Sequence, residues 1–261
     1  IEQNNYAIDN LKELLEEQNL SKEERYLANS YIAQAFINTK KLDSSLFYLK
    51  KSVFKQKDFL LNTRRKFLLA QLYQELSIQD TAYSIYSEII DLHRKIPRDF
   101  YINSYIKRTM VSDSIDNSIA ELQLLTENFE NNNYLDIIFH QIAMLNLKKG
   151  ELLNDDKSGF TITDSTAINF FNKSLRSDSE EEFLIAKNYN ELAELNFRKK
   201  NYLEAGQYYD STLTQLSKKS REFRKIKRKR ENLNDLIYYE KISSSLDSII
   251  NLIEMPEKKR E

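Results

Sequence analysis

The chain has 261 residues and a formal net charge of -1, because its 39 Lys and Arg residues nearly balance its 40 Asp and Glu residues. This balance argues against a dedicated nucleic-acid-binding protein, which usually carries a basic excess. The absence of cysteine excludes disulfides, thiolate metal sites and thiol catalysis. Three glycines and two prolines compare with about 18 and 13 at average usage, and strand-rich domains need both at their turns. The composition therefore predicts an all-α chain.

The N-terminal end is typical of a protein that continues upstream. The chain begins at Ile1 without a Met or a signal peptide, which favours a piece of a longer protein or a processed form. Residues 5–17 are expected to form the second helix of a repeat whose first helix precedes the chain. No apolar run approaches the roughly 18 residues of a membrane-spanning helix.

Five segments that follow share one order of residues. The pattern is a small residue, then an apolar residue near a turn, then a second small residue with a large apolar residue four positions later, and the third segment is degenerate, with Ile106 at the first position. Small residues let two helices approach closely while large ones fill the remaining gap, so this order predicts packed helix pairs. The five sets are Ala33, Phe36, Leu42, Ser45, Leu49 and Ser52; Ala70, Tyr73, Ala82, Tyr86 and Ile89; Ile106, Ile115, Ser118, Leu122 and Leu125; Ala143, Ala167, Phe171 and Ser174; and Ala193, Tyr202, Ala205, Tyr209 and Thr212.

The spacing of these segments resembles that of the tetratricopeptide repeat, whose period is about 34 residues. It is 37 residues from Ala33 to Ala70 and 36 from Ala70 to Ile106. The predicted fold is all-α, an α-solenoid of about five tetratricopeptide repeats with a C-terminal capping helix pair. We place a half-repeat at 1–20, repeats at about 23–57, 60–95, 97–130, 132–177 and 181–217, two C-terminal helices at 218–255 and a charged tail at 256–261.

Capping signals predict several helix boundaries. Ser21 with Glu24 and Ser177 with Glu180 have the capping-box spacing that begins a helix. Helices are expected to end at Asn131–Asn133 and at Gly150, because Asn and Gly favour the residue after a helix.

The fourth repeat carries an insertion over residues 150–166, which we expect to be a polar excursion between its two helices. Its acidic and hydroxyl residues resemble calcium ligands, but the ligand order of an EF-hand and its closing Glu are missing. The residues considered are Asp155, Asp156, Ser158 and Asp164.

Two histidines are the candidates for catalysis. His93 has no carboxylate or second histidine three or four positions away, and His140 has only Asp136 four positions before it. Such a pair lacks a nucleophile and a third metal ligand, and no phosphate-binding, dinucleotide-binding or nucleophile-elbow motif is present. We therefore predict no enzymatic activity, no cofactor and no metal site.

In tetratricopeptide proteins the first helix of each repeat lines a concave surface, and solenoids commonly bind partners there. Placing the repeats in register gives a mixed polar wall without the Lys/Asn/Arg clamp of chaperone-binding members, so a C-terminal acidic peptide is not the favoured ligand. The alternative is that these residues only face water. The predicted partner-binding residues are Gln34, Asn38, Gln71, Gln74, Lys107, Met110, His140, Met144, Asn190, Glu194 and Arg198.

Residues 221–230 form the most basic stretch of the chain, with seven Lys or Arg. Phe223, Ile226, Leu233 and Ile237 fall on one helical face, so an amphipathic helix is expected to pack on the fifth repeat with its basic face outward. An acidic protein partner, a solvated face, an anionic membrane and nucleic acid are the alternatives for this face. The predicted partner-binding residues are Arg224, Lys225, Lys227, Arg228 and Lys229.

A second amphipathic stretch follows the basic one. It is predicted to form a further capping helix, with its apolar residues on one face. These residues are Ile242, Leu246, Ile249, Ile250 and Ile253.

Three C-terminal segments carry a more specific resemblance. "NYLEAGQYYDSTL" at 201–213, "REFRKIKRKRENLNDLIYYE" at 221–240 and "LDSIINLIEM" at 246–255 resemble the SprE/PorW family, tetratricopeptide lipoproteins of the type IX secretion system and gliding machinery of Bacteroidota. The resemblance implies a non-enzymatic scaffold on the periplasmic face of the outer membrane. Such a scaffold links the periplasmic motor ring with the outer-membrane translocon through protein contacts and has no nucleic-acid partner.

The family's lipidated Cys is not in this chain, so the resemblance places membrane association in a lipid anchor outside it. The alternative function is a tetratricopeptide sensor or interaction module of a bacterial signalling protein. That alternative predicts a transmembrane helix and a kinase or DNA-binding domain after Glu261.

Overall fold

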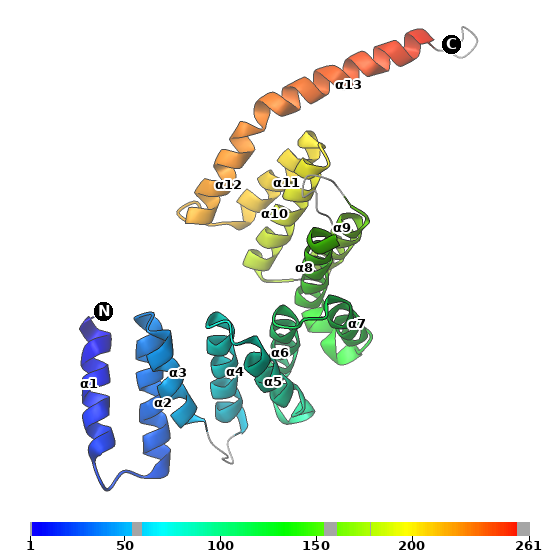
Figure 1. The fold of residues 1–261 in the computed structure, drawn as a ribbon. Helices are drawn as coiled ribbons and strands as arrows, with labels where there is room; N and C mark the ends of the chain where they lie inside the picture. The colour runs from blue at the N-terminus through cyan, green and yellow to red at the C-terminus, as the bar shows by residue number, and fades with distance from the viewer. Residues whose placement is uncertain (1, 54–58, 154–160, 178, 255–261) are drawn as a thin grey trace. The chain divides into compact units, whose positions relative to one another are not determined.

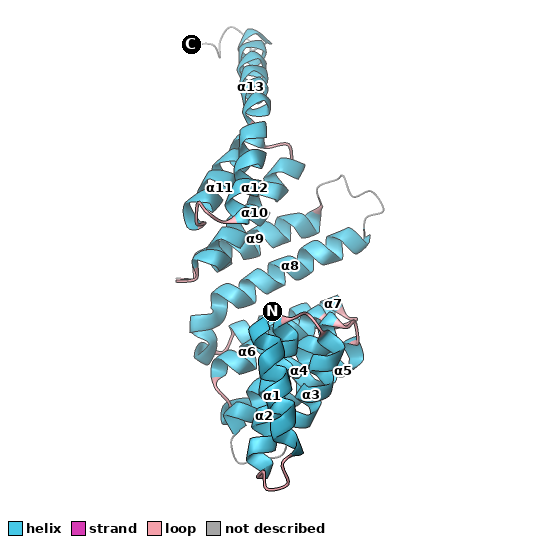
Figure 2. Cartoon of the chain, turned by 90° about the vertical axis from the view of Figure 1, so that its left-hand side faces the viewer, coloured by secondary structure: helices cyan, strands magenta, loops and turns pink. Residues whose placement is uncertain are grey.

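The computed structural model is built of helices and their connections (Figure 1). It describes residues 2–53, 59–153, 161–177 and 179–254, and within these ranges no strand occurs (Figure 2). The predicted all-α fold class is therefore confirmed. The α-helices are α1 (Glu2–Glu16), α2 (Lys22–Asn38), α3 (Leu42–Ser52), α4 (Phe59–Glu75), α5 (Gln79–Ile90), α6 (Arg98–Met110), α7 (Ile115–Thr126), α8 (Leu135–Leu153), α9 (Ile162–Leu175), α10 (Glu182–Arg198), α11 (Tyr202–Gln215), α12 (Arg221–Asn232) and α13 (Asn234–Glu254), and the 3-10 helices are η1 (His93–Lys95) and η2 (Phe129–Tyr134).

The chain divides into two compact units, Ile1–Ser118 and Ile119–Glu261. In the first unit α2 pairs with α3 and α4 with α5, while α1 packs on α2 and α6 on α5. In the second unit α8 pairs with α9 and α10 with α11, and α12 packs on α11. The boundary falls inside α7, in the third predicted repeat. That repeat has Ile106 where the other four have an alanine.

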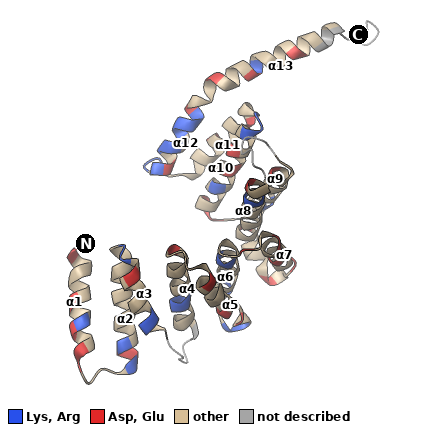
Figure 3. Ribbon diagram, in the orientation of Figure 1, with Lys and Arg blue, Asp and Glu red and all other residues tan. Residues whose placement is uncertain are grey.

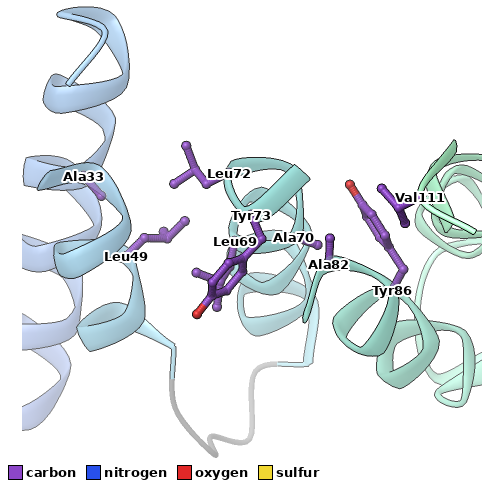
Figure 4. Packing of buried hydrophobic residues seen from close by; sticks show 9 residues of the cluster. All are labelled: Ala33, Leu49, Leu69, Ala70, Leu72, Tyr73, Ala82, Tyr86 and Val111. Atoms are coloured by element: carbon purple, nitrogen blue, oxygen red, sulfur yellow. The ribbon is translucent and has the colours of Figure 1, made fainter. Parts of the chain in front are cut away.

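The residues of the repeat pattern form the buried core of the first unit. Ala33, Ala70 and Ala82 are fully buried in one cluster with Leu49 and Tyr86, which Figure 4 shows among α2, α3, α4 and α5. Because alanine has no bulk beyond its Cβ, the helix backbones approach closely, and the leucine and tyrosine side chains fill the space at crystal-like density. These are tetratricopeptide-type helix pairs, so the fold is the predicted tetratricopeptide α-solenoid.

Three of the first helices of these pairs end with the same hydrogen-bonded turn. The residue after the C-cap is left-handed in each, with φ of 59° at Lys40, 60° at Ser77 and 66° at Lys200. The next N–H donates back across the turn, as from Lys41 to the Phe36 carbonyl at 2.9 Å, which is the Schellman motif. Glycine usually occupies this left-handed position. Lys and Ser occupy it here, which helps to explain the low glycine content.

Two of the predicted helix-end signals are recognisable in the structure. The Ser21 hydroxyl accepts from the Glu24 N–H at 3.2 Å while the Glu24 carboxylate accepts from the Ser21 N–H at 2.8 Å, so this capping box is confirmed. The helix expected to end at Asn131–Asn133 ends earlier, at Thr126. Asn131 closes it by donating from its buried side-chain amide to the Leu125 carbonyl at 2.7 Å, which satisfies an end carbonyl.

The capping box predicted at Ser177 and Glu180 is wrong. Glu181 is the N-cap of α10, and it makes no side-chain capping bond. The Ser177 hydroxyl instead donates to the Lys173 carbonyl at 2.7 Å. This hydroxyl therefore bonds to the end of α9, where the Lys173 carbonyl also accepts from the Arg176 N–H at 3.2 Å.

Gly150 was expected to end a helix, and this prediction is also wrong. Gly150 lies inside α8, which continues to Leu153. A Cβ at this position would lie 2.3 Å from Oγ1 of Thr163 and 3.3 Å from Oγ1 of Thr161. The glycine therefore permits the close approach of α8 to the start of α9. Residues 154–160 of the insertion, including Asp155, Asp156 and Ser158, lie outside the described residues.

The two C-terminal helices differ in how much of each is covered. In α12, Ile226 is buried, and it joins a cluster with Ala205 and with Leu233, the C-cap of the helix. In α13 the covered part is its beginning, where Ile237 packs against that cluster and the Glu240 carboxylate accepts from the Leu203 N–H at 2.9 Å.

The rest of α13 differs from the expected capping helix. Its described side chains from Lys241 to Ile250, and that of Ile253, are exposed. The apolar residues of this face, with their exposed fractions, are Ile242 at 39%, Leu246 at 53%, Ile249 at 53%, Ile250 at 51% and Ile253 at 64%. The stretch has helical spacing, but no described element covers it.

Candidate partner-binding surfaces

In the first unit, the predicted residues of α2 join α2 to α1. The Gln34 side-chain amide donates to the Asn38 side-chain oxygen at 3.1 Å, and the Asn38 amide donates to the Asn4 side-chain oxygen on α1 at 3.2 Å. All three side chains are amides, and Gln34 and Asn38 are exposed while Asn4 is half-buried, so this face offers neutral donors and acceptors to a partner.

The predicted residues of α4 and α6 also share contacts. The Tyr86 hydroxyl donates to the Gln74 side-chain oxygen at 3.3 Å, and the Gln74 amide lies 4.0 Å from the sulfur of Met110. Met110 is exposed, and Gln71 and Lys107 are half-buried. Gln74 therefore secures α5 while its neighbours remain accessible in part.

In the second unit, His140 belongs to a hydrogen-bond chain that joins three helices. Its Nδ1 lies 2.7 Å from Oδ1 of Asn188, the Asn188 amide donates to the Ser174 hydroxyl at 2.8 Å, and that hydroxyl donates to the Asp136 carbonyl at 2.7 Å. Because Oδ1 of Asn188 can only accept, Nδ1 of His140 carries the proton.

Burial lowers the pKa of His140, and this effect exceeds the opposite effect of the Asn188 hydrogen bond. The ring is therefore neutral near pH 7, and it packs beside Phe171 with centroids 5.7 Å apart. Asp136 does not hydrogen-bond the ring; its carboxylate accepts from the Ile137 N–H at 2.7 Å. His140 thus joins α8 to α10, and Met144, one turn further along α8, is half-buried.

Two predicted residues of α10 are occupied by contacts within the unit. The Arg198 guanidinium lies 2.9 Å from the carboxylate of Asp164. Asp164, which the sequence analysis considered as a calcium ligand and rejected, is buried and forms a capping box with Thr161 at the start of α9. Glu194 accepts from the Tyr209 hydroxyl at 2.8 Å and forms an ion pair with Lys229 of α12.

The carboxylates of α10 influence each other and the neighbouring tyrosine. Burial raises the pKa of Glu191, and the nearby charge of Glu194 raises it further. Burial also raises the pKa of Tyr209, with a smaller effect from its hydrogen bond to Glu194. A cation is therefore favourable over this part of α10, and Lys229 supplies it.

The basic residues of α12 divide into an outer and an inner set. Arg224, Lys225, Lys227 and Arg228 are exposed, and Figure 3 shows the basic residues along this helix. Lys227 forms only a long i,i+4 pair with Glu231, at 3.7 Å. The inner set is Lys229, which pairs with Glu194, and Arg230, which pairs with Asp210 at 2.9 Å.

Sequence reasoning placed Lys229 on the outer face and left Arg230 out. A signal for the inner position was present, because Lys229 stands three residues after Ile226 and four before Leu233. Residues at these spacings share a helix face. The structure therefore brings Glu194 and Lys229, predicted on separate surfaces, into direct contact.

Two hollows lie between α10 and α12. The first, called here the α10–α12 hollow, has a volume of about 210 Å³ and is lined by Phe183, Ala186, Lys187, Asn190, Thr212, Leu216, Glu222, Lys225, Ile226 and Lys229. The second has a volume of about 360 Å³ and is lined by Glu194, Phe197, Tyr209, Lys229, Asn232, Leu233 and Leu236. Of the predicted residues, Asn190, Lys225 and Lys229 thus meet at one site.

Across the ranges that the structure describes, no group of three or more His, Asp or Glu side chains is arranged to hold a metal ion. Within the same ranges, none of the helices has both the length and the apolar character needed to cross a membrane.

No protein-family model and no curated protein matches this chain. Among solved structures, it is similar to the MamA RS-1 ArsTM double mutant, with 12% identity and a TM-score of 0.48 over 75% of this chain and 96% of that one. It is similar to the TPR domain of P58(IPK), with 18% identity and a TM-score of 0.35 over 88% and 61%. It is also similar to the TPR2AB domain of yeast Sti1 in complex with pHSP90, with 15% identity and a TM-score of 0.32 over 90% and 91%. At such identities these likenesses concern the fold alone.

Proposed function

We propose that the chain is a non-enzymatic scaffold that binds protein partners through its repeat helices and through the basic face of α12. The observation that carries this proposal is the anchoring of α12. Its inner side is fixed by Ile226, by the Lys229–Glu194 ion pair and by the Arg230–Asp210 ion pair, while its outer basic side chains remain exposed. Charges on a fixed helix lose little freedom on binding, so less of the interaction energy is lost to ordering.

The residues predicted to bind partners divide into two roles in this proposal. Arg224, Lys225 and Arg228 are exposed and offer their charges directly. Glu194, Arg198 and Lys229 are engaged within the unit, so they position the surface. His140 does the same for α8 and α10, while Asn190, Met144, Gln71, Lys107 and Met110 supply the accessible parts of the repeat helices.

We further propose that the chain is a component of the type IX secretion system, at the periplasmic face of the outer membrane, where it connects the motor ring with the translocon. The support is the resemblance of residues 201–213, 221–240 and 246–255 to the SprE/PorW family. Those residues correspond to α11, α12 and α13, so the resemblance coincides with the basic helix and the exposed apolar stretch.

The experiment is affinity purification of the tagged full-length protein from detergent-solubilised envelopes, followed by mass spectrometry and crosslink mapping. We expect the translocon and the motor-ring lipoproteins to co-purify, with crosslinks at α12. The variant R224E/K225E/R228E should lose this capture while the matched reversal K148E on α8 retains it. Recovery of soluble regulators alone would contradict the secretion role and favour the signalling module.

A further inference from the structure

We propose that the α10–α12 hollow is a recognition pocket for one large apolar side chain, Leu or Phe, of a partner segment that carries Asp or Glu on either side of it. This inference rests on the proposed protein-binding function and names the chemistry of the partner.

The surface of the hollow is mainly apolar, and its walls come from α10, α11 and α12. Phe183 and Ala186 face it from α10, Ile226 from α12, and Thr212 and Leu216 from the end of α11. The lining residues on α10 and on α12 follow the i, i+3, i+4, i+7 spacing of one helix face. The two faces therefore form opposite walls, and a side chain from outside can enter between them.

The volume of the hollow suits a single side chain. At about 210 Å³ it exceeds the roughly 150 Å³ of an apolar protein cavity that binds benzene. It is therefore large enough for a phenylalanine ring or a leucine. Ala186, Thr212 and Ile226 are buried, so the floor is already shielded from water, and an apolar group that enters the hollow buries the surface it places against that floor.

The rim of the hollow is predominantly basic. Lys187 and Lys225 are exposed at its edge, and neither forms an ion pair with another described residue. Nζ of Lys187 lies 4.5 Å from the centroid of the Phe183 ring, so this cation sits directly beside the apolar wall. Glu222 is the acidic residue of the lining. Two unpaired cations against one carboxylate favour a segment with acidic residues on either side of its apolar anchor.

The hollow is formed before a partner arrives. The Ser220 hydroxyl caps α12 by accepting from the Phe223 N–H at 3.0 Å, and Lys229 ties the far end of the lining stripe to Glu194. Because Ile226 is buried in the middle of this stripe and Lys229 holds its far end, α12 is already anchored and the hollow is present without a partner. A preformed pocket surrounded by polar residues is the usual form of a binding hot spot.

The test uses the full chain, labelled for methyl and amide NMR, and a short synthetic peptide of Asp and Glu with one central Phe. We expect shift changes at Ala186 and Ile226 that saturate on titration. Matched peptides with Ser in place of Phe, or with Gln in place of the acidic residues, should bind at least about tenfold more weakly. A tenfold rise in Kd corresponds to the loss of about 1.4 kcal/mol of binding free energy.

Protein variants separate the hollow from the general basic face. K187E/K225E, at two exposed rim positions, should weaken binding by at least about tenfold, whereas R228E, the same charge change on the outer side of α12, should weaken it much less. A186L should fill the hollow and abolish binding. If A186L fails to fold, the rim variant still decides the question, because both of its positions are exposed.

Three results would overturn the pocket. These are an absence of shift changes, changes confined to the outer face of α12, and equal binding of the Ser peptide. Equal shift changes with an oligonucleotide or with anionic lipid vesicles would likewise mean that the rim attracts any anion. If the peptide does not bind but the chain still captures its partners from envelopes, the scaffold function stands and the pocket does not. If the peptide binds but envelope capture fails, the pocket stands and the secretion role does not.

Discussion

The two C-terminal helices, α12 and α13, have similar apolar spacing but very different surroundings. Ile226 of α12 is 8% exposed and lies in a cluster with Tyr209. Ile249 of α13 has equivalent helical spacing and is 53% exposed. The basic helix is thus the better buried of the two, although its sequence is by far the more charged.

The anchoring of a helix therefore depends on its inner face and not on its overall polarity. The long stems of Lys229 and Arg230 lie along the neighbouring helices and end in ion pairs with Glu194 and Asp210, so basic residues contribute to the contact. The exposed part of α13 has apolar side chains but no described element against which to bury them. A helix can therefore display an apolar face without being held by it.

The largest effect is expected from truncating the covered side. Leu233 is 2% exposed, so L233A should lower the free energy of unfolding by about 2–5 kcal/mol. The matched change I249A on α13 should alter it by less than about 0.5 kcal/mol. Urea unfolding followed by circular dichroism measures both. Comparable losses in the two variants would show that α13 is as well packed as α12.

A somewhat smaller effect is expected from enlarging a residue beneath α12. Ala205 is fully buried in the cluster that holds Ile226 and Leu233. A205W should therefore overpack this contact and cost about 1–3 kcal/mol, seen as a lower thermal midpoint. Q207W, at an exposed position of the same helix, is the control for tryptophan itself. An unchanged midpoint for A205W would contradict the packing of α12 on α11.

The two sides of α12 should respond differently to the same charge reversal. K229E loses the ion pair with Glu194 and adds a like charge beside it, so it should lower stability by about 1 kcal/mol. K225E lies on the exposed side and should leave the thermal midpoint unchanged. If both reversals leave it unchanged, the Lys229–Glu194 pair does not hold the helix.

The smallest effect concerns the pH dependence of the α10–α12 contact. The raised pKa of Glu191 means that the folded state binds this proton more readily than the unfolded state does. Its stabilising contribution is therefore complete below the unfolded pKa of about 4.3 and is lost as pH rises through the higher folded value. E191Q should gain stability relative to the wild type as pH rises over this window, in parallel urea titrations.

The pKa of His140 is shifted in the opposite direction to that of Glu191, so the pH dependence of H140Q is a control for that of E191Q. Its lowered pKa adds stability that is complete above the unfolded value of about 6.5 and is lost as pH falls through the folded value. H140Q should therefore flatten the decrease of stability on the acid side of neutrality. For Glu191, a difference in the free energy of unfolding between E191Q and the wild type that does not change with pH would mean that burial of Glu191 has no energetic effect.

Much of the fold could be predicted because it depends on local spacing. The alanines at 33, 70, 143 and 193 and the large residues that accompany them identify helix pairs without any knowledge of distant contacts. The Ser21 capping box is local for the same reason. These features need only residues within one or two helices of each other.

The parts that could not be predicted depend on contacts between segments. Gly150 is a helix-ending residue by its local preference, but Thr163 of the next helix requires a small residue there. The α10–α12 hollow needs residues of three helices, and periodicity alone cannot show that Phe183 and Ile226 face each other. The exposure of α13 is of the same kind, since spacing defines an apolar face but not what covers it.

The left-handed turns at Lys40, Ser77 and Lys200 have a practical consequence for protein engineering. An L-amino acid in this conformation stores strain of about 1–2 kcal/mol that glycine avoids. The side chains of all three residues are exposed, so replacing them removes no buried contact. Each is therefore a position where a glycine should raise the thermal midpoint. Because the three turns belong to different helix pairs, their gains should add, giving a more heat-resistant chain with its binding surfaces unaltered.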